Sequence, residues 1–312
     1  MEYKTLGRTS LRVSKIGFGA SPLGDEFGET DPAEGERAVH CAIDLGINYF
    51  DVAPYYGGTL AESRLGEALA GRRDRVVLST KCGRYDVSSF DFRSKRIRES
   101  LDESLKRLRT DYIDLFFAHD IEFVDAAQII EEAIPTMRAL QQEGKVRFIG
   151  ITGLQLKMLH RVAEAAPVDA ILSYCRYNLL VTDMDDLLTP FTEDRGIGLI
   201  NASPLHMGVI TRKGPPEWHP ASDEVKEAGR AIVELCDQRG ISASDPALQF
   251  CVAHPYVATT LVGMTTAEHV RGNVDAASRQ ADAGLIAEIR DRFAAAHNRI
   301  WPSGRPENQD AR

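Results

Sequence analysis

Four side chains suited to acid–base chemistry follow short apolar runs of the chain. Asp51 and Tyr56 lie in residues 51–57 (DVAPYYG), Lys81 in residues 79–82 (STKC) and His119 in residues 116–120 (FFAHD). Taken singly, such a lysine is usually a solvated surface charge and such a histidine is usually packed. If the apolar runs are consecutive parallel strands of a barrel, however, all four residues converge at one end of it.

A tyrosine beside a lysine can transfer protons. Ionising a tyrosine of pKa ~10 near neutral pH costs about 4 kcal/mol. The Coulomb attraction of an ammonium ~4 Å away stabilises the phenolate by on the order of 4 kcal/mol at an effective dielectric constant of ~20. We therefore expect Lys81 to make Tyr56 a usable proton donor and acceptor. Asp51 would hold Lys81 as its ion-pair partner, and His119 would donate a hydrogen bond to the substrate oxygen.

The elements that must position these residues alternate along the chain. Short β-branched and aromatic runs are followed by longer amphipathic stretches, the pattern of a parallel sheet in which a helix follows each strand. Eight such runs favour a closed (β/α)8 TIM barrel over an open sheet. The expected strands are 16–18, 49–51, 76–79, 113–117, 146–151, 170–173, 198–201 and 259–262, and the clearest helical patterns are 33–45, 61–70, 95–108 and 129–143.

The remaining segments suggest how such a barrel is closed. Residues 3–5 and 11–13 flank a Gly-Arg-Thr-Ser turn and are predicted to form an N-terminal β-hairpin that plugs the bottom. The breaker-rich loop 214–220 and the irregular C-terminal tail 300–312 either fold over a substrate or are ordinary surface segments. We interpret residues 1–312 as a single barrel domain.

Charge and composition exclude several classes of partner. With 37 basic and 46 acidic residues the net charge is −9, which disfavours binding to nucleic acid or to an anionic membrane. The five cysteines form no C-x-x-C pair, and the eight histidines show no metal-ligand spacing, so no metal is expected. Without a signal core or a long apolar span, the protein is expected to be cytoplasmic. The oligomeric state stays open.

These motifs resemble those of a known family. The segments DVAPYYG, STK and FAH resemble, in order and spacing, the Asp-Tyr-Lys-His motifs of the aldo-keto reductases. The resemblance extends over nearly the whole chain, through Leu-Gly-Arg-Thr at 6–9, Gly-Phe-Gly at 17–19, Asp-Tyr-Ile-Asp-Leu at 111–115 and Ser-Pro-Leu at 203–205. It implies a (β/α)8 barrel, a nicotinamide cofactor bound without a Rossmann domain, and Tyr56 as the general acid or base. No G-x-G-x-x-G fingerprint or P-loop is present.

The cofactor site implied by the resemblance departs from the family in three places. The asparagine usual near the fifth strand is replaced within residues 151–154, where Thr152 is the remaining candidate. Ala202 replaces the tyrosine that often stacks on nicotinamide, and Tyr174 replaces a glutamine that binds the carboxamide. Residues 263–273 lack the cations that bind the 2′-phosphate of NADP, which favours NAD, although Arg271 keeps NADP possible. The candidate cofactor-binding residues are Gly19, Thr152, Tyr174, Ser203, Pro204, Leu205, Gly263, Thr265, His269 and Asn273.

The segments IGITGL (149–154), LSYC (172–175) and NASPL (201–205) are similar to those of the L-galactose and L-fucose (D-threo-aldose) dehydrogenases. This similarity implies oxidation of the anomeric carbon of a free aldose to the lactone with NAD. An NADPH-dependent aldehyde or ketone reductase and a pyridoxal dehydrogenase are alternatives within the family. A nicotinamide-binding regulatory subunit is the alternative outside enzymes, and the complete tetrad argues against it. Candidate substrate-facing residues, each with a packing alternative, are Tyr55, His119, His206, Trp218 and Trp301.

Overall fold

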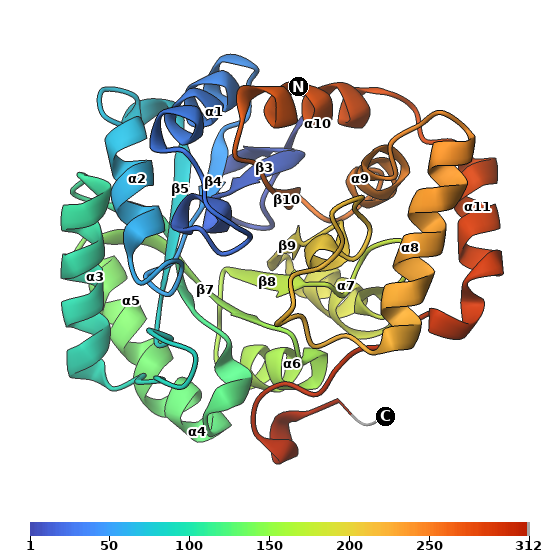
Figure 1. Cartoon of the computed structure of the whole chain (residues 1–312). Coiled ribbons are helices and arrows are strands. Elements are labelled where there is room, and N and C mark those ends of the chain that lie inside the picture. Colours follow the sequence, from blue (N-terminus) through green and yellow to red (C-terminus); the bar gives the residue numbers. More distant parts are fainter. Residues whose placement is uncertain (311–312) are drawn as a thin grey trace.

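A closed barrel of parallel strands forms the centre of the protein. The computed structural model describes residues 1–310, and in that part of the chain eight strands pair in the order β10-β3-β4-β5-β6-β7-β8-β9 (Figure 1). The predicted TIM barrel is therefore confirmed, although β5 and β7 run three and two residues beyond their predicted ends at 79 and 151. The barrel strands are β3 (Ile16–Gly19), β4 (Tyr49–Asp51), β5 (Val77–Cys82), β6 (Ile113–Ala118), β7 (Val146–Gly153), β8 (Ala170–Tyr174), β9 (Gly198–Ala202) and β10 (Thr259–Gly263).

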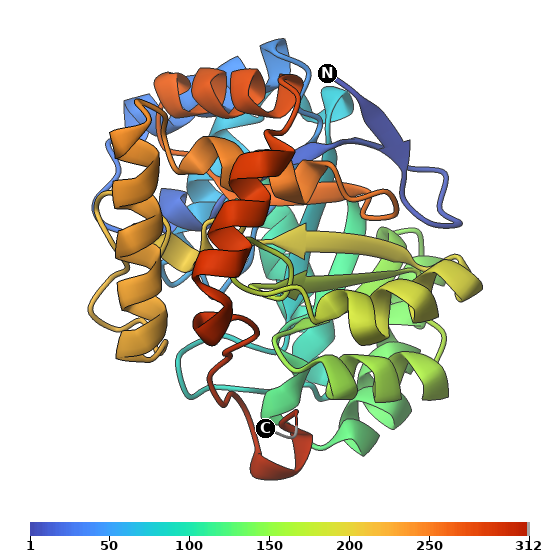
Figure 2. The ribbon, with the colours of Figure 1, turned by 90° about the vertical axis from the view of Figure 1, so that its right-hand side faces the viewer.

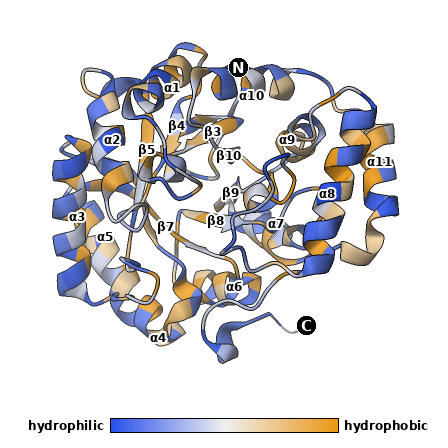
Figure 3. Ribbon diagram, in the orientation of Figure 1, coloured by the Kyte–Doolittle hydropathy of each residue, from blue (hydrophilic) through white to orange (hydrophobic). Residues whose placement is uncertain are grey.

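Helices surround the barrel and turn their apolar sides towards it. In Figure 3, α3 and α8 show alternating hydrophilic and hydrophobic bands, as expected for helices with one side in water and one side packed on a core. The helices are α1 (Pro32–Asp44), α2 (Leu60–Ala68), α3 (Ser94–Leu108), α4 (Ala126–Gln128), α5 (Ile134–Gln142), α6 (Leu156–Ala165), α7 (Met184–Arg195), α8 (Asp223–Gln238), α9 (Ser244–Val252), α10 (Ala267–Ser278) and α11 (Ala283–Arg292).

One predicted helix is interrupted. Instead of a single helix over 129–143, a π-helical turn at Ile129–Ala133 separates α4 from α5. Pro135 follows this turn and has no N–H with which to bond the carbonyl four residues earlier. The wider turn accommodates that missing hydrogen bond.

The N-terminal hairpin closes the base of the barrel. Strands β1 (Tyr3–Thr5) and β2 (Arg12–Ser14) pair antiparallel, one residue later in the second strand than predicted. Leu6 and Val13 are fully buried in the cluster that fills the barrel interior. Gly7 has φ +52°, and a Cβ there would lie 2.3 Å from the backbone nitrogen of Gly198. Figure 2 shows the hairpin at the end of the barrel opposite the arrowhead of β9.

The C-terminal tail is attached on the side of α6, below which it runs in Figure 1. Its described part, 300–310, contains only a short 3₁₀ turn at Pro306–Asn308. Residues 311 and 312 of the predicted irregular tail lie outside the described chain. Asp310 accepts hydrogen bonds from the backbone N–H groups of Leu156 (3.0 Å) and Lys157 (2.9 Å), at the start of α6. Arg176 donates to the same carboxylate at 2.7 Å. Across residues 1–310, no helix combines the length and apolar character needed to span a bilayer.

Candidate active site

The carboxyl ends of the strands place one inward-facing residue each around the mouth of the barrel. Side chains alternate between the two faces of a strand. On β5, Leu78 and Cys82 pack in the helix-facing core, whereas Val77 packs against the inner core. Lys81 therefore points inward. The same alternation puts the following residues on the inner face at the mouth, with His119 one position after β6: Gly19, Asp51, Lys81, His119, Thr152, Tyr174, Ala202 and Gly263.

The predicted lysine network is present. Lys81 Nζ donates to Asp51 Oδ1 at 2.5 Å, to the carbonyl of Val52 at 2.9 Å and to the hydroxyl of Tyr56 at 3.2 Å. The other oxygen of Asp51 accepts from Ser79 Oγ at 2.7 Å. Because Lys81 is only 1 % exposed, all three of its donors are used inside the protein, and they fix the ammonium beside the phenol.

Burial dominates the electrostatics of Tyr56. It raises the pKa of this phenol to about 12, even though the Lys81 ammonium acts to lower it. The sequence argument had the correct sign for Lys81 but omitted desolvation, which penalises the phenolate. In the protein alone Tyr56 is thus protonated at neutral pH and acts as a proton donor.

His119 is placed to donate to an oxygen beside Tyr56. Its ring lies edge-on to that of Tyr56, with centroids 5.7 Å apart, and edge-on to that of Tyr55 at 6.1 Å. Burial, together with the charges of Lys81 and Arg84, holds the pKa of His119 well below its usual range. The imidazole is therefore neutral at physiological pH and carries one N–H donor.

An ion pair that the sequence analysis missed lies beside this histidine. Arg84 Nη1 donates to Asp120 Oδ2, and that oxygen is 3.7 Å from His119 Nε2. The Arg84 guanidinium carbon lies 3.8 Å from the ring centre of Tyr55. Asp120 directly follows His119, and Arg84 comes three residues after Lys81. Opposite charges just beyond two adjacent strand ends were the signal available in the sequence.

The opposite side of the mouth suits a flat ring. Gly19 pairs with Gly263 across β3 and β10, and Ala202 pairs with Tyr174 across β9 and β8. None of these four residues is buried. Three small residues on adjacent strands leave space at the mouth, and an aromatic side chain borders that space. This arrangement fits the nicotinamide ring of the expected cofactor.

Strained backbone marks the turns after β8 and β9. Cys175, Ser203, His206 and Met207 all have φ between +51° and +63°, a region that non-glycine residues seldom adopt. The turn 203–205 is closed by a hydrogen bond from the N–H of His206 to the carbonyl of Ser203 at 2.9 Å. Such strain clusters where a ligand site demands a particular backbone shape. Contact of Ser203, Pro204 and Leu205 with a cofactor remains a prediction.

The other predicted cofactor residues lie on β7 and α10. Thr152 is buried on the inner face of β7. At the start of α10, Thr266 Oγ1 accepts from the N–H of His269 at 3.1 Å, and the Thr265 hydroxyl lies 3.2 Å from His269 Nδ1. Thr265 and His269 are thus brought together, with half-buried Asn273 one helical turn further on. Their contact with a cofactor remains a prediction.

The predicted substrate residues fall into two groups. Tyr55 and His119 adjoin Tyr56. His206 and Trp301 pack edge-on at 5.4 Å, and His206 is fully buried, with its Nδ1 3.1 Å from Asn178 Nδ2. Trp218 is 53 % exposed. Within residues 1–310, no hydrogen bond or aromatic pair joins these last three to the tetrad, and their contact with substrate stays a prediction.

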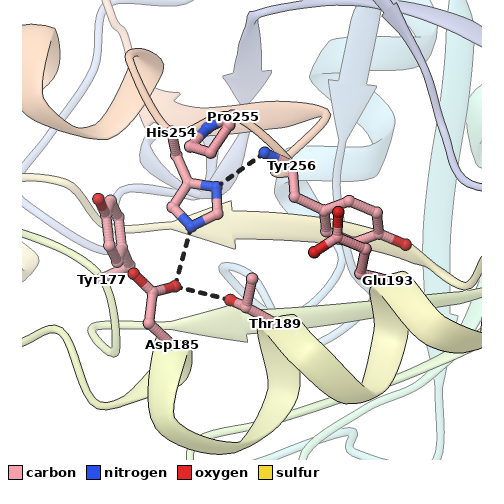
Figure 4. A pocket seen from close by; sticks show the side chains of 7 residues that line it. All are labelled: Tyr177, Asp185, Thr189, Glu193, His254, Pro255 and Tyr256. Atoms are coloured by element: carbon pink, nitrogen blue, oxygen red, sulfur yellow. Dashed lines mark hydrogen bonds and ion pairs between the residues drawn. The ribbon is translucent and has the colours of Figure 1, made fainter.

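A further pocket lies outside the mouth, beside α7 and the segment after α9 (Figure 4). His254 Nε2 is 2.8 Å from Asp185 Oδ1, which also accepts from Thr189 Oγ1 at 2.7 Å. His254 Nδ1 accepts from the N–H groups of Tyr256 and Val257 at 3.1 and 3.0 Å. Both ring nitrogens are therefore used in holding the segment, and we assign this histidine a structural role. In the described chain no group of three or more His, Cys, Asp or Glu residues is placed to hold a metal ion.

Comparison with known proteins agrees with this geometry. The sequence model of the Aldo/keto reductase family matches residues 15–292. An L-galactose dehydrogenase of Arabidopsis thaliana is 45% identical over 318 residues, which cover 99% of this chain and 99% of that protein. A D-threo-aldose 1-dehydrogenase of Pseudomonas sp. is 29% identical, with 90% and 94% covered. The holo structure of an aldo-keto reductase from Bacillus halodurans has a TM-score of 0.79 and 28% identity, with 96% and 98% covered.

Proposed function

Because the chain belongs to the aldo/keto reductase family and is an oxidoreductase, we propose that it oxidises the anomeric carbon of a free aldose to the lactone with NAD. The observation that carries the proposal is the contact of Lys81 with both Asp51 and the Tyr56 hydroxyl. A full-length relative named for L-galactose oxidation supports the aldose as substrate.

The protein groups would act on the C1 hydroxyl of the cyclic sugar. His119 donates a hydrogen bond to the C1 oxygen and holds it beside Tyr56. Tyr56 is protonated in the protein alone, so for oxidation it must first release its proton to solvent. The resulting phenolate then accepts the hydroxyl proton, hydride leaves C1 as the C1–H bond breaks, and a C1=O bond forms, which leaves the lactone. When bound, the oxidised nicotinamide supplies the hydride acceptor at its ring and a positive charge. Lys81 favours the phenolate, so it assists proton removal in this direction.

The start of α10 supports NAD rather than NADP. There the Thr266 hydroxyl caps the helix, and His269 lies beside the Thr265 hydroxyl. Glu268 is exposed in the same turn and would repel the 2′-phosphate of NADP. A phosphate dianion needs cationic or charge-assisted donors, and Arg271 is the one cation among residues 263–273.

The test is to follow nicotinamide absorbance with a panel of free aldoses that includes L-galactose and L-fucose, using NAD and NADP in parallel. We expect NAD-dependent oxidation of one or two sugars, and a loss of at least ~10²-fold in kcat on Tyr56→Phe, which keeps the ring but removes the proton acceptor. If no sugar is oxidised while NADPH supports aldehyde reduction, the protein is instead a general carbonyl reductase.

A further inference from the structure

The geometry points to Asp120 as a residue that makes the enzyme select substrates carrying a hydroxyl on C2, next to the reacting carbon. This inference rests on the proposed aldose oxidation. It concerns the buried pair Asp120–Arg84, which the catalytic steps above do not use.

The carboxylate of Asp120 is held at the reacting end of the site. The residue follows His119 directly and is only 2 % exposed. Its backbone has φ +54°, in the left-handed region that aspartate and asparagine adopt more readily than most residues. This conformation directs the carboxylate to within 3.7 Å of His119 Nε2.

Arg84 binds one of the two carboxylate oxygens of Asp120 and leaves the other without a donor. Its guanidinium lies between aromatic rings, 3.8 Å from the centre of Tyr55 and 5.5 Å from that of Phe123, and donates to Asp120 Oδ2. Asp120 Oδ1 has no hydrogen-bond partner in residues 1–310 although it is buried. A buried carboxylate oxygen without a donor is costly, and such atoms occur where a ligand completes the hydrogen bonding.

Sugar geometry identifies the donor that this oxygen would accept. In the proposed reaction His119 donates to the oxygen on C1. Because Asp120 Oδ2 lies 3.7 Å from His119 Nε2, the Asp120 carboxylate would lie close to the atoms next to C1. Adjacent hydroxyl oxygens of a sugar lie about as far apart as two hydrogen-bonded oxygens, about 2.8 Å. The oxygens next to the C1 hydroxyl are the ring oxygen, which carries no hydrogen, and the C2 hydroxyl. Since a carboxylate only accepts hydrogen bonds, the C2 hydroxyl is the partner.

The alternative is that Asp120 and Arg84 merely stabilise the loops after β5 and β6. Loss of stability lowers the turnover of every substrate alike, whereas loss of a specific hydrogen bond changes the ratio between two substrates on one protein. The decisive readout is therefore the ratio of kcat/KM for the preferred aldose to kcat/KM for its 2-deoxy analogue.

The variant is Asp120→Asn, because asparagine tolerates the left-handed backbone. Arg84 keeps the amide oxygen at the Oδ2 position, so the amide NH2 takes the place of Oδ1. The C2 hydroxyl can then only accept from this NH2, and that neutral hydrogen bond is weaker than the charge-assisted bond to the carboxylate. The matched control is Asp114→Asn at the base of β6, where Asp114 is also 1 % exposed and paired with arginines, Arg73 at 2.8 Å and Arg147 at 2.6 Å.

We expect the wild type to prefer the aldose over its 2-deoxy analogue by ~10²-fold or more, because a site built around a hydroxyl rejects the analogue that lacks it. The preference should fall below ~10-fold in Asp120→Asn and persist in Asp114→Asn. A wild-type ratio near one overturns the inference without any variant, and so does an unchanged ratio in Asp120→Asn. If the wild type oxidises the aldose but the kcat/KM ratio does not behave in this way, only the inference about Asp120 is wrong. If the wild type oxidises no aldose, both the proposed function and the inference are wrong.

Discussion

Glu122 is a buried acid whose ionisation should weaken the fold as the pH rises. Its Oε1 accepts from the N–H of Leu154 at 2.9 Å and from the hydroxyl of Ser303 in the C-terminal tail at 3.3 Å. Its Oε2 is buried without a hydrogen-bond partner among residues 1–310. Burial raises the pKa of Glu122 to about 8, and the negative charge of Asp120 adds to the effect.

The direction and size of the effect follow from proton linkage. The ordinary pKa of 4.5 applies to the unfolded chain, and about 8 applies to the folded protein. Between these values the unfolded state has lost the proton while the folded state retains it. The stability contributed by protonated Glu122 is therefore fully present below pH 4.5 and is lost progressively as the pH rises to about 8. The slope contributed by this group is about 1.4 kcal/mol per pH unit, and the whole window amounts to on the order of 5 kcal/mol.

Glu122→Gln replaces the neutral carboxyl with a side chain that has no proton to lose. We expect the variant to gain stability relative to the wild type from about pH 5 to about pH 8, measured as the free energy of unfolding in urea. The matched control is Glu62→Gln. Glu62 is equally buried but bonds Arg107 at 2.7 Å, so removal of its charge should destabilise the protein at about pH 8.

Parallel pH profiles of the wild type and Glu122→Gln would refute the reasoning, because Glu122 would then be ionised or solvated in the folded state. A variant that is less stable than the wild type at about pH 8 would mean that the buried carboxylate gains more from its hydrogen bonds than it loses through burial.

Two further changes test the site and the base of the barrel. Lys81→Met removes the ammonium that favours the Tyr56 phenolate, so kcat for oxidation should fall by ~10²-fold or more. Circular dichroism should show that the variant keeps the fold. An unchanged kcat would exclude the proposed role of the lysine. Gly7→Ala places a Cβ against the backbone of Gly198 at φ +52°, so the unfolding free energy should drop by at least ~2 kcal/mol in urea titration. Gly71→Ala is its control, since Gly71 has φ +71° but no atom within 4 Å of an added Cβ; equal losses in both variants would show that backbone strain alone matters.

The strand ends were the part of the site that sequence could predict. Apolar runs mark the strands, and a barrel brings their ends together, so the convergence of Asp51, Lys81 and His119 followed from local patterns alone. The hairpin followed similarly from two short strands around a turn, and the structure moved its second strand by one residue. The break before α5 was also readable in principle, because Pro135 cannot continue an α-helical hydrogen-bond ladder.

Properties that depend on long-range packing could not be predicted in this way. The pKa of Tyr56 is governed by how deeply the phenol is enclosed, and that enclosure involves segments distant in sequence. Arg84 and Asp120 were not singled out from the sequence, because nothing local indicates that the guanidinium packs on Tyr55. The burial of His206 likewise depends on Trp301, which lies far along the chain.

The first strand and the last described residue lie at opposite ends of the barrel, because β1 belongs to the hairpin at the base and Asp310 contacts the start of α6, which follows the carboxyl end of β7. An affinity tag fused before β1 would project from the base, away from the mouth. A tag fused after residue 312 would be separated by only two residues from Asp310, whose carboxylate accepts hydrogen bonds from the start of α6 and from Arg176. Purification and immobilisation on a sensor surface are therefore better served by a tag at the amino end, which leaves the mouth of the barrel open.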